Sequence, residues 1–407
     1  MVAVLASSWG FGVCNVVRTK SRPRDDTRKL NVAMLGTRGV PASYSGFETC
    51  VERLGARLVE QGHTVTVYCR AHHIKYPGDT FKGMRLIKFP TVRNKYLDTL
   101  VHAFLSSLHA LFRPYDVCLY FIAGNSLVTW IPRLAGKRTI INVDGLDWKR
   151  EKWPQVAKSY IRFAERMATI LPDAFITDSR VVQRYYLDTY GARAPYIAYG
   201  SDVEPLPPGE VLARWQLEPR KYILFVGRLV PENCAHHLVE AFAMLGNKDG
   251  MKCVIVGDAA YADDYISGLK SSAGEDVIFT GYQFGDSYRE LSSNAYCFVE
   301  TSGVGGTHPA LLEAMGFGSC VVVNDTLENL ETIGDAGLSY SGQSGPESLR
   351  DVLQQLIDNP NVVLERGIRA LQHVKKHYSW DAVTEQYLRL FNRVLKGRRV
   401  RKRKWPE

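Results

Sequence analysis

The strongest constraint on the fold is that short apolar, strand-like runs alternate with helix-like segments along nearly the whole chain. In the first half, segments 47–63, 98–112 and 159–172 have apolar residues at helical spacing. The strand-like runs around them are 29–36, 64–70, 116–124, 138–145 and 174–179. Alternation of this kind is typical of a parallel sheet with helices on both faces. The sequence therefore predicts an α/β fold.

The alternation is interrupted once, in segment 199–215, where three prolines fall within four residues. Such a cluster indicates a linker. A second series follows, with strand-like runs at 221–228, 252–257, 277–281, 296–300 and 320–324 and helix-like segments at 236–245 and 309–318. We therefore expect two doubly wound domains joined by a hinge. Ligands of such sheets bind at the carboxyl ends of the strands, which places the site in a cleft between the domains.

These boundaries divide the chain into five parts. We expect a disordered basic leader over 1–29, a first domain over 30–204, a second domain over 205–378, a long amphipathic helix over 379–395 and a basic tail over 396–407. Ser379 is the expected N-cap of the long helix. The first 17 residues carry no charge and lack a basic n-region, so they do not read as a signal peptide.

The net charge of +9 is concentrated in the two ends of the chain. Residues 1–29 carry +4 and residues 396–407 carry +6, which leaves about −1 for the rest. A nucleic-acid-binding fold would show its basic surface on the domain itself, so we expect no nucleic-acid partner. Segment 396–404 has seven basic residues in nine. It predicts binding to an anionic membrane surface, with a solvated tail as the alternative.

Cysteine and histidine give no sign of a metal site by their spacing. No two of the eight cysteines form a C-x-x-C pair, and several fall in apolar runs, so buried reduced thiols in a reducing compartment are expected. The ten histidines show no metal-ligand spacing, and we expect no tightly bound metal.

Two glycine-rich loops precede helices, which suits the binding of a phosphate. One contains Gly36, Gly39 and Gly46, and the other contains Gly303, Gly305 and Gly306. Backbone N–H groups at a helix N-terminus can approach an anion there, although turn geometry alone also explains such glycines. Arg228 directly follows a strand-like run and can form a bidentate contact with a diphosphate.

The dinucleotide and Walker glycine patterns are both absent, which argues against an NAD enzyme and an ATPase. A nucleoside diphosphate with a group attached fits both loops better.

Several long blocks resemble the retaining nucleotide-sugar glycosyltransferases of family 4, which have the GT-B fold. The blocks are "GFETCVERLGARLVEQGHTVTVY", "FVGRLVPENCAHHLVEAF", "PALLEAMGFGSCVVVND" and "YSWDAVTEQYL", and the likeness runs from Lys29 to Leu395. The resemblance implies two Rossmann-like domains facing a cleft, with the acceptor on the first domain and the nucleotide sugar on the second. It also implies that helix 379–395 crosses back to pack on the first domain.

The resemblance assigns roles to individual positions. Arg228 takes the place of the diphosphate-binding arginine, Glu313 that of the ribose-binding carboxylate, and Gly46 that of a glycine contacting the donor phosphate. The expected donor-binding residues are Gly39, Gly46, Arg228, Asn233, Tyr282, Gly305, Gly306, Thr307, His308 and Glu313. The expected catalytic residues are Asp144, Arg228 and Glu313.

Two segments of the first domain are expected to face the acceptor. Tyr44, Phe47 and Glu48 lie on the first glycine loop or at the start of the helix after it. The segment "DWKREKW" mixes tryptophan, which stacks on sugars, with cations that meet a diphosphate; a solvated helix surface is the alternative reading. Its candidate residues are Trp148, Lys149 and Arg150.

The chain departs from the family pattern at three positions. Gly305 stands where the family has its first glutamate, Asn233 where it has a lysine, and Asp144 is the nearest candidate for its histidine. Since the surrounding blocks are intact, we interpret the changes as specialisation. The buried-strand residue Glu300, thirteen positions before Glu313, receives no role.

A narrower resemblance concerns the donor sugar. "GTRGVPASYSGFET", "NVDGLDWKREKW", "GRLVPEN" and "GVGGTHPALLEAM" are similar to the bacterial rhamnosyltransferases that build surface polysaccharides such as capsule. This implies dTDP-L-rhamnose as donor, a lipid-diphosphate-linked saccharide as acceptor and no metal cofactor. A 6-deoxy sugar has one hydroxyl fewer for the missing glutamate to bind.

The expected activity is therefore that of a retaining hexosyltransferase, in the cytoplasm and peripheral on the inner face of the cell membrane. With no carboxylate nucleophile in place, attack by the acceptor hydroxyl on the same face as the leaving diphosphate is expected. Two alternatives remain open: the same fold with a UDP- or GDP-sugar donor, and a non-catalytic nucleotide-sugar-binding protein.

Overall fold

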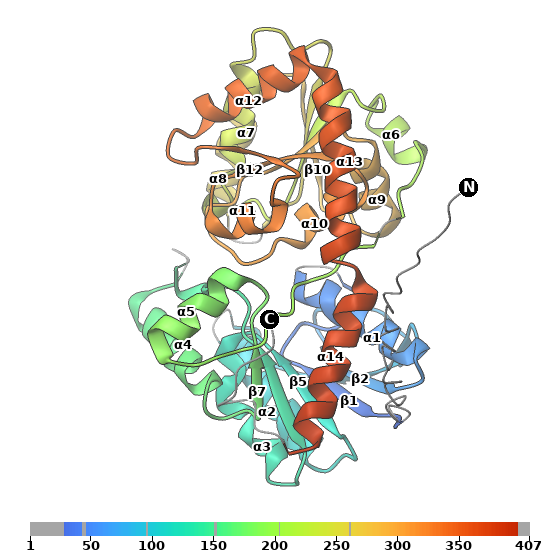
Figure 1. Cartoon of the computed structure of the whole chain (residues 1–407), viewed down its shortest axis with the longest axis vertical. Helices are drawn as coiled ribbons and strands as arrows, with labels where there is room; N and C mark the ends of the chain where they lie inside the picture. Colours follow the sequence, from blue (N-terminus) through green and yellow to red (C-terminus); the bar gives the residue numbers. More distant parts are fainter. Residues whose placement is uncertain are drawn as a thin grey trace, which may run out of the picture.

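The molecule consists of two α/β domains, one above the other, with a long helical segment running along both (Figure 1). The computed structural model describes residues 28–42, 46–94, 97–149, 153–202, 204–259 and 262–397. Nearly all of the leader and of the basic tail lie outside these ranges. The predicted α/β class and its division into two doubly wound halves are confirmed.

The first domain contains a seven-stranded sheet in the order β3-β4-β2-β1-β5-β6-β7. Its strands are β1 (Asn31–Leu35), β2 (Thr64–Arg70), β3 (Thr80–Phe81), β4 (Met84–Phe89), β5 (Val117–Phe121), β6 (Arg138–Asn142) and β7 (Ala174–Ile176). All neighbouring strands are parallel except β3 and β4, which form a short antiparallel pair. Consecutive residues such as Val32 and Ala33 are both fully buried, because helices cover the two faces of the sheet.

The helices of this domain follow the spacing of apolar residues. In α1, Val51, Leu54 and Leu58 are buried and lie on one side of the helix, so that side packs on the sheet. The helical segments are α1 (Gly46–Glu60), α2 (Asp98–Leu111), η1 (Ala123–Val128), α3 (Trp130–Arg133), η2 (Asp147–Lys149), α4 (Gln155–Ala168) and α5 (Arg180–Tyr190).

The second domain contains a six-stranded, wholly parallel sheet in the order β10-β9-β8-β11-β12-β13. Its strands are β8 (Tyr222–Val226), β9 (Lys252–Val256), β10 (Val277–Gly281), β11 (Cys297–Glu300), β12 (Cys320–Asn324) and β13 (Leu338–Tyr340). Its helical segments are α6 (Glu210–Arg214), η3 (Pro231–Asn233), α7 (Ala235–Ala243), α8 (Asp263–Ser272), α9 (Gly285–Asn294), α10 (Pro309–Gly316), α11 (Leu327–Ile333), α12 (Pro346–Asp358) and α13 (Pro360–His377).

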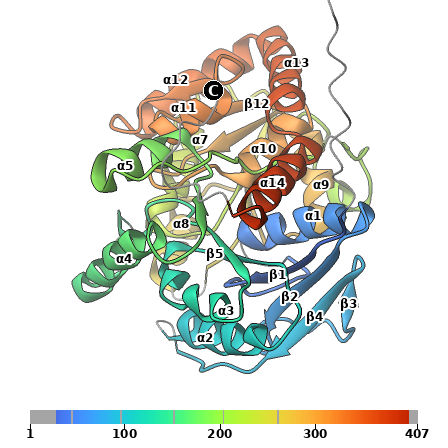
Figure 2. The same cartoon turned by 60° about the horizontal axis from the view of Figure 1, so that its bottom comes forward.

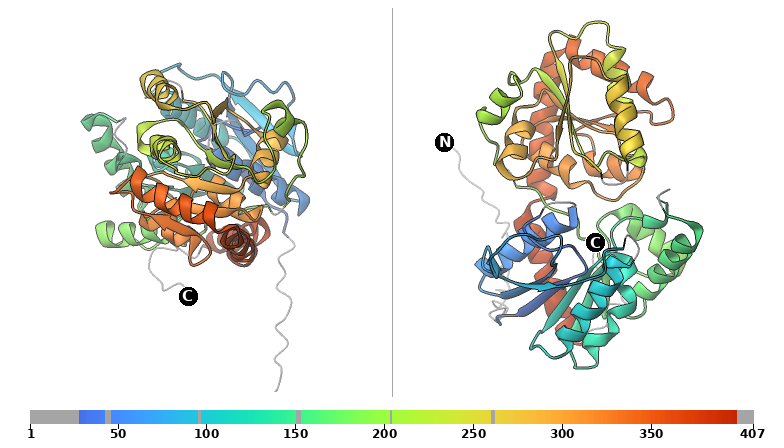
Figure 3. Two further views of the ribbon diagram at one scale, coloured as in Figure 1. Left: turned by 90° about the horizontal axis from the view of Figure 1, so that it is seen from above. Right: turned by 180° about the vertical axis from the view of Figure 1, so that it is seen from behind.

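Both sheets have the doubly wound strand order, in which the chain reverses direction across the sheet at one point. The reversal falls between β1 and β5 in the first domain and between β8 and β11 in the second. The loops that leave these four strands all line the cleft between the domains. The fold therefore brings the two expected ligand-binding edges to the same place (Figure 3).

The last helix, α14 (Trp380–Leu395), crosses back onto the first domain, where it packs beside α1 (Figure 2). Ser379 caps it as predicted, because its hydroxyl accepts a hydrogen bond from the Ala382 N–H. The Asn142 side-chain amide at the end of β6 donates to the Tyr387 hydroxyl at 3.2 Å, and both side chains are buried. The crossing helix is thus held to the core of the first domain by a polar contact as well as by apolar packing.

A second contact between the domains lies on the opposite side of the cleft. The Glu331 carboxylate of α11 accepts hydrogen bonds from the backbone N–H groups of Arg180 and Val181, at 2.9 and 3.2 Å. These groups are at the first turn of α5, where intrahelical partners are missing. The second domain therefore completes the N-terminus of a helix in the first.

Two of the predicted segments differ from the structure in their bounds or content. Helix α4 begins at Gln155, because Pro154 adopts an extended conformation as its N-cap, rather than at 159. The segment 199–215 includes the short helix α6 as well as the linker. Among the helices in the described ranges, none has both the length and the apolar character that crossing a bilayer requires.

Candidate active site in the interdomain cleft

The cleft between the domains has a volume of about 2160 Å³. Pockets for a single small ligand are typically about 300–1,000 Å³, so two substrates fit side by side here. One wall comes from the loops after β8, β10 and β11 together with α10, and the other from the loops after β1, β5 and β6 together with α1.

Arg228 lies on the wall of the second domain, two residues after β8 ends. The Asn233 side-chain amide donates to the Arg228 carbonyl at 2.9 Å, and the Thr301 hydroxyl donates to the Asn233 carbonyl at 2.5 Å. Asn233 therefore braces the loop that carries the arginine. It contributes no charge, so the positive charge that this loop presents to a ligand comes from Arg228.

The second glycine loop contacts the first domain. The Thr307 N–H donates to the Asp178 carboxylate at 3.3 Å, and the Thr307 hydroxyl donates to the Asp178 carbonyl at 2.8 Å. A β-carbon at Gly306 would lie 2.6 Å from the same carboxylate, so a glycine is required there. The Thr307 N–H was expected to face the donor phosphate, but in this structure Asp178 accepts its hydrogen bond.

Gly305, where the family pattern has its first glutamate, lies beside His308, which in turn lies near Glu300. A β-carbon at Gly305 would lie 2.6 Å from the His308 ring. The His308 Nδ1 atom is 3.8 Å from the Glu300 carboxylate, which also accepts a hydrogen bond from the Ser302 N–H at 3.0 Å. Glu300 is 4% exposed yet lines the cleft. A carboxylate is therefore present in this part of the cleft, from the end of β11 rather than from the loop.

Glu313 lies one turn into α10 and lines the cleft. Burial raises its pKa above the usual value, while the Tyr288 hydroxyl and the Arg53 guanidinium act in the opposite direction. A carboxyl group in such a setting gains from a partner that donates hydrogen bonds, as a ribose hydroxyl does.

Two aromatic rings follow β10 at the rim of the cleft. Tyr282 and Phe284 stack with ring centroids 5.7 Å apart and planes at 21°, and they are 39% and 48% exposed. Exposed stacked rings offer a platform for a planar base. Tyr282 was among the sequence-predicted donor residues, whereas Phe284 was missed because a single aromatic residue in a loop carries little signal.

Asp144 lines the cleft from the first domain, and Asp178 forms a carboxyl pair with it from the buried interior behind the wall. The Tyr199 hydroxyl donates to Asp144 at 3.2 Å. Asp178 is fully buried, and burial together with the neighbouring Asp144 carboxylate raises the pKa of Asp178 well above its usual range. Two neighbouring carboxyl groups disfavour the state in which both are ionised. Asp178 was not singled out from the sequence, although its position two residues after β7 was a usable signal.

A cationic patch lines the cleft farther along the first domain. Its members are Arg38, Arg53, Arg70 and Arg93, and the rings of His72 and His73 lie beside Arg70 around the Asp98 carboxylate. Arg70 is paired with Asp98 at 2.8 Å, and the Glu48 carboxylate accepts a hydrogen bond from the Arg38 N–H at 3.0 Å. Glu48 therefore fixes the first glycine loop, in addition to lining the cleft as expected of an acceptor-side residue.

The other residues expected on the first glycine loop have different surroundings. Phe47 lines the cleft and packs edge-to-face on Phe121, with centroids 6.3 Å apart. Gly46 also lines it, and a β-carbon there would lie 2.5 Å from Pro309, so α1 and α10 meet at this glycine. Gly39 instead packs on Cys69 and is not among the described residues that line the cleft, which corrects its placement at the donor.

Among the predicted acceptor residues of "DWKREKW", the two that the structure describes do not line the cleft. Trp148 packs beneath the Arg162 guanidinium, 4.0 Å from its ring, and Lys149 is exposed to solvent. Neither belongs to the described lining of the cleft; the segment contributes Asp147 and Trp153 instead. Tyr44 and Arg150 lie outside the described residues.

Two clusters of potential metal ligands are present in the described ranges. One is His72, His73 and Asp98 in the cationic patch, and the other is Cys234, His236 and His237 at the start of α7. The fold brings Asp98 to the two histidines of the first cluster, whereas the second lies within four consecutive residues, a local signal that was not recognised in the sequence.

Comparison with known proteins bears on this geometry. Residues 220–359 match the family model described as glycosyl transferases group 1, and residues 117–202 match one described as a domain of unknown function (DUF1972). Over residues 220–359 the second domain is similar to the glycosyl transferases group 1 family. That stretch contains Arg228, the second glycine loop and Glu313.

Curated relatives are similar over part of their length. The O-antigen chain mannosyltransferase B of Escherichia coli is 26% identical over 204 residues, covering 48% of this chain and 52% of that protein. The phosphatidyl-myo-inositol mannosyltransferase of Mycobacterium leprae is 27% identical over 231 residues, covering 54% and 59%. The chain spans about half the length of these relatives.

Solved structures show the same architecture over nearly the whole chain. Sucrose-phosphate synthase from Thermosynechococcus elongatus has a TM-score of 0.76 at 20% identity, covering 91% of this chain and all of that one. HepE from Anabaena, in complex with UDP-glucose, has a TM-score of 0.73 at 16% identity, covering 90% and 100%. The predicted GT-B fold, with two Rossmann-like domains and a crossing helix, is confirmed.

Proposed function

We propose that the protein transfers a sugar from a nucleotide donor to a saccharide acceptor with retention of configuration. The observation that carries the proposal is that Arg228 and Glu313 line one wall of a cleft large enough for two substrates. Both residues lie within residues 220–359, the stretch that matches the glycosyl transferases group 1 model. An arginine for the diphosphate and a carboxylate for the ribose suit a nucleoside diphosphate in this wall.

The reaction needs stabilisation of the negative charge that develops on the leaving diphosphate. Arg228 supplies positive charge, and the N-terminus of α10 supplies a favourable dipole. The acceptor hydroxyl attacks from the face that the diphosphate leaves, and the diphosphate takes its proton. Asp144 lies on the opposite wall with Asp178 buried beside it, and the Asp144 carboxyl group can form a hydrogen bond with a sugar hydroxyl.

We propose dTDP-L-rhamnose as the donor. The reason is the resemblance described above together with the site at Gly305, where His308 fills the space of the usual side chain. A UDP- or GDP-sugar is the alternative, since two of the relatives are mannosyltransferases and the HepE structure contains UDP-glucose.

The acceptor is proposed to be a diphosphate-linked lipid saccharide at a membrane surface. The cationic patch on the first domain suits a diphosphate. Exposed apolar side chains also follow one side of α2, at Leu97, Phe104, Leu108 and Phe112, and Phe112 is 81% exposed.

The surface around α2 includes basic residues, whose positive charge an anionic membrane would attract. Helix α3, which packs beside α2, adds exposed Trp130 and Leu134. The Lys137 ammonium donates to the Leu111 carbonyl at 2.9 Å, next to Phe112. Gly397, the last described residue, lies close to Arg138, which directly follows Lys137 in the chain. Apolar anchors with basic residues around them favour an anionic bilayer.

A panel of nucleotide sugars with a lipid-diphosphate saccharide tests the activity. We expect turnover with dTDP-L-rhamnose, and a loss of at least about 100-fold in kcat/KM for Arg228→Ala and Glu313→Ala. Arg184→Ala is the matched control, because Arg184 is exposed and paired only with Asp188 in its own helix. Turnover of another sugar would replace the donor assignment, and unchanged activity in both variants would overturn the site.

A non-catalytic nucleotide-sugar-binding protein is the second candidate, favoured by the absence of a carboxylate at Gly305. It predicts that calorimetry detects donor binding, weakened by Arg228→Ala, while no donor on the panel is consumed. The buried Glu300 carboxylate beside His308 favours the enzyme instead.

A further inference from the structure

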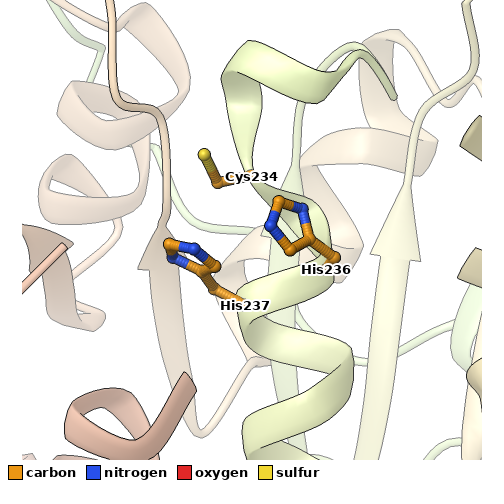
Figure 4. Close-up of side chains that lie close together, drawn as sticks. All are labelled: Cys234, His236 and His237. Carbon is orange, nitrogen blue, oxygen red and sulfur yellow. The ribbon is translucent and has the colours of Figure 1, made fainter. Parts of the chain in front are cut away.

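Three side chains converge outside the cleft, at the point where the turn Pro231–Asn233 becomes helix α7 (Figure 4). Cys234, His236 and His237 each offer one ligand atom, and these atoms all lie within 4.8 Å of one another. All three side chains are half-buried. They do not line the cleft, whereas Pro231, Glu232 and Asn233 of the same turn do.

Each histidine is oriented by a tyrosine from another element. The Nδ1 atom of His236 pairs with the Tyr265 hydroxyl of α8 at 2.9 Å, and that of His237 pairs with the Tyr340 hydroxyl of β13 at 3.0 Å. Nε2 is then the nitrogen available to a metal in both rings. A hydrogen bond to the second ring nitrogen is the arrangement that fixes metal-binding histidines in proteins.

The charges around the cluster suit a cation. The Glu347 carboxylate lies close enough to His237 to interact with it electrostatically, so a cation bound there has an anionic neighbour.

The cluster of His72, His73 and Asp98 is less suited, because its carboxylate is already paired with the Arg70 guanidinium at 2.8 Å. A cation bound to that carboxylate would meet the positive charge of Arg70.

We propose that Cys234, His236 and His237 form a site for a divalent, thiolate-binding transition metal such as Zn²⁺, with a water molecule as fourth ligand. The Cys234 thiol releases its proton to solvent as the metal–sulfur bond forms. Tetrahedral bonds of about 2.0 Å to nitrogen and 2.3 Å to sulfur place ligand atoms roughly 3.3–3.6 Å apart. The ligand atoms offered by the cluster lie within 4.8 Å of one another, so the side chains must rotate closer together to reach that spacing.

A metal bound here would fix the turn Pro231–Asn233, which lines the same wall of the cleft as Arg228. Cys234 follows Asn233 directly, and Asn233 braces the Arg228 carbonyl. The metal therefore acts on the cleft through the position of this turn. Binding itself does not depend on whether the proposed transfer reaction is correct.

Competition between the purified full chain and a chromogenic zinc chelator tests the site. We expect one high-affinity equivalent of Zn²⁺, weakened by at least about tenfold in Cys234→Ser and His237→Ala, and by roughly tenfold in Tyr340→Phe. His73→Ala is the matched control for the rival cluster and should not change the affinity. Unfolding temperatures without metal show that the variants are folded, and added Zn²⁺ should raise the unfolding temperature of the wild type but not of Cys234→Ser.

Binding of Co²⁺ distinguishes a thiolate ligand from adventitious binding. We expect a sulfur-to-cobalt charge-transfer band in the near ultraviolet that Cys234→Ser removes. The proposal is overturned by the absence of zinc binding at micromolar free metal, by affinity unchanged in Cys234→Ser, or by affinity lost only in His73→Ala.

Discussion

Glu165 shows how strongly the surroundings of the cleft alter the pKa of a single side chain. It is 1% exposed, and its carboxyl group accepts hydrogen bonds from the Tyr185 and Tyr190 hydroxyls, both at 3.1 Å. Burial nevertheless raises its pKa from 4.5 to about 7. The folded state therefore binds this proton more tightly than the unfolded state does.

The pH dependence of stability should change in Glu165→Gln. Since the folded pKa is raised, the stabilisation is complete below about pH 4.5 and is lost as the pH rises to about 7. The wild type should lose roughly 3 kcal/mol relative to the variant across this window. Urea unfolding at several pH values measures it; parallel stability curves for the two proteins would contradict the pKa shift.

Gly306 permits the contact between the second glycine loop and Asp178. Gly306→Ala would place a β-carbon 2.6 Å from the Asp178 carboxylate. We expect a loss of roughly 1–3 kcal/mol in the free energy of unfolding from this overpacking, together with weaker donor binding. Chemical unfolding and calorimetry with the nucleotide measure the two effects.

Gly274→Ala is the control, because nothing lies within 4 Å of a β-carbon at that position. If Gly306→Ala were as stable as this control, the close approach of Asp178 would not exist in solution.

Single site residues were predictable where a local pattern surrounds them. Arg228 directly after a strand and Glu313 in its helix were both found, and both line the cleft. Asp178 was missed because its partner Thr307 belongs to the other domain. Glu300 was left without a role because its partner His308 is brought back to it by a tight loop. Trp148 was misplaced, since a mixture of tryptophan and cations does not reveal that Arg162 covers the ring.

At the scale of elements, the crossing helix α14 depends on one buried polar pair. Tyr387→Phe would leave the Asn142 amide without this acceptor inside the core. We expect a loss of about 1–3 kcal/mol in the free energy of unfolding, measured in urea. Tyr76→Phe serves as the comparison because its ring is exposed. Equal stability of the two variants would show that the pair contributes nothing.

Elements were predictable where apolar periodicity and a clear end signal coincide, as in α1 and α10. Helix α13 was missed although Pro360 starts it, because one buried position on its inner side is Gly367 rather than a large apolar residue. That glycine packs against the Gly318 carbonyl, where a β-carbon would lie 2.2 Å away. The short pair β3 and β4 was missed because two residues of β3 form no periodic pattern.

At the scale of the whole molecule, the apolar side of α2 and the basic tail should act together on membranes. Phe112→Ser should weaken binding to anionic vesicles by about tenfold, since a large apolar side chain contributes roughly 1.5–3 kcal/mol. Deleting residues 398–407 should weaken it further and reduce its dependence on salt. Vesicle sedimentation at two salt concentrations measures both effects.

The comparison variant for this surface is Phe163→Ser, whose exposed ring lies on α4 instead. Equal losses for Phe112→Ser and Phe163→Ser would contradict a specific membrane-facing side. Binding that is unaffected by the tail deletion would remove the tail from the proposal.

The sequence was sufficient to predict two doubly wound halves and a cleft, because strand–helix alternation and the proline cluster are local signals. It could not place the halves against one another. The contacts that do so join distant residues, such as Asp178 with Thr307 and Arg180 with Glu331. Each depends on backbone positions that only the assembled domains define.

The contacts of the Glu331 carboxylate make the opening and closing of the cleft measurable. This carboxylate supplies acceptors for the Arg180 and Val181 amides only while the two domains are together. Each separation of the domains on that side leaves the first turn of α5 to exchange its amide hydrogens with solvent. Hydrogen–deuterium exchange at these two positions should therefore record how often the cleft opens, and a bound donor that holds it shut should slow both amides together.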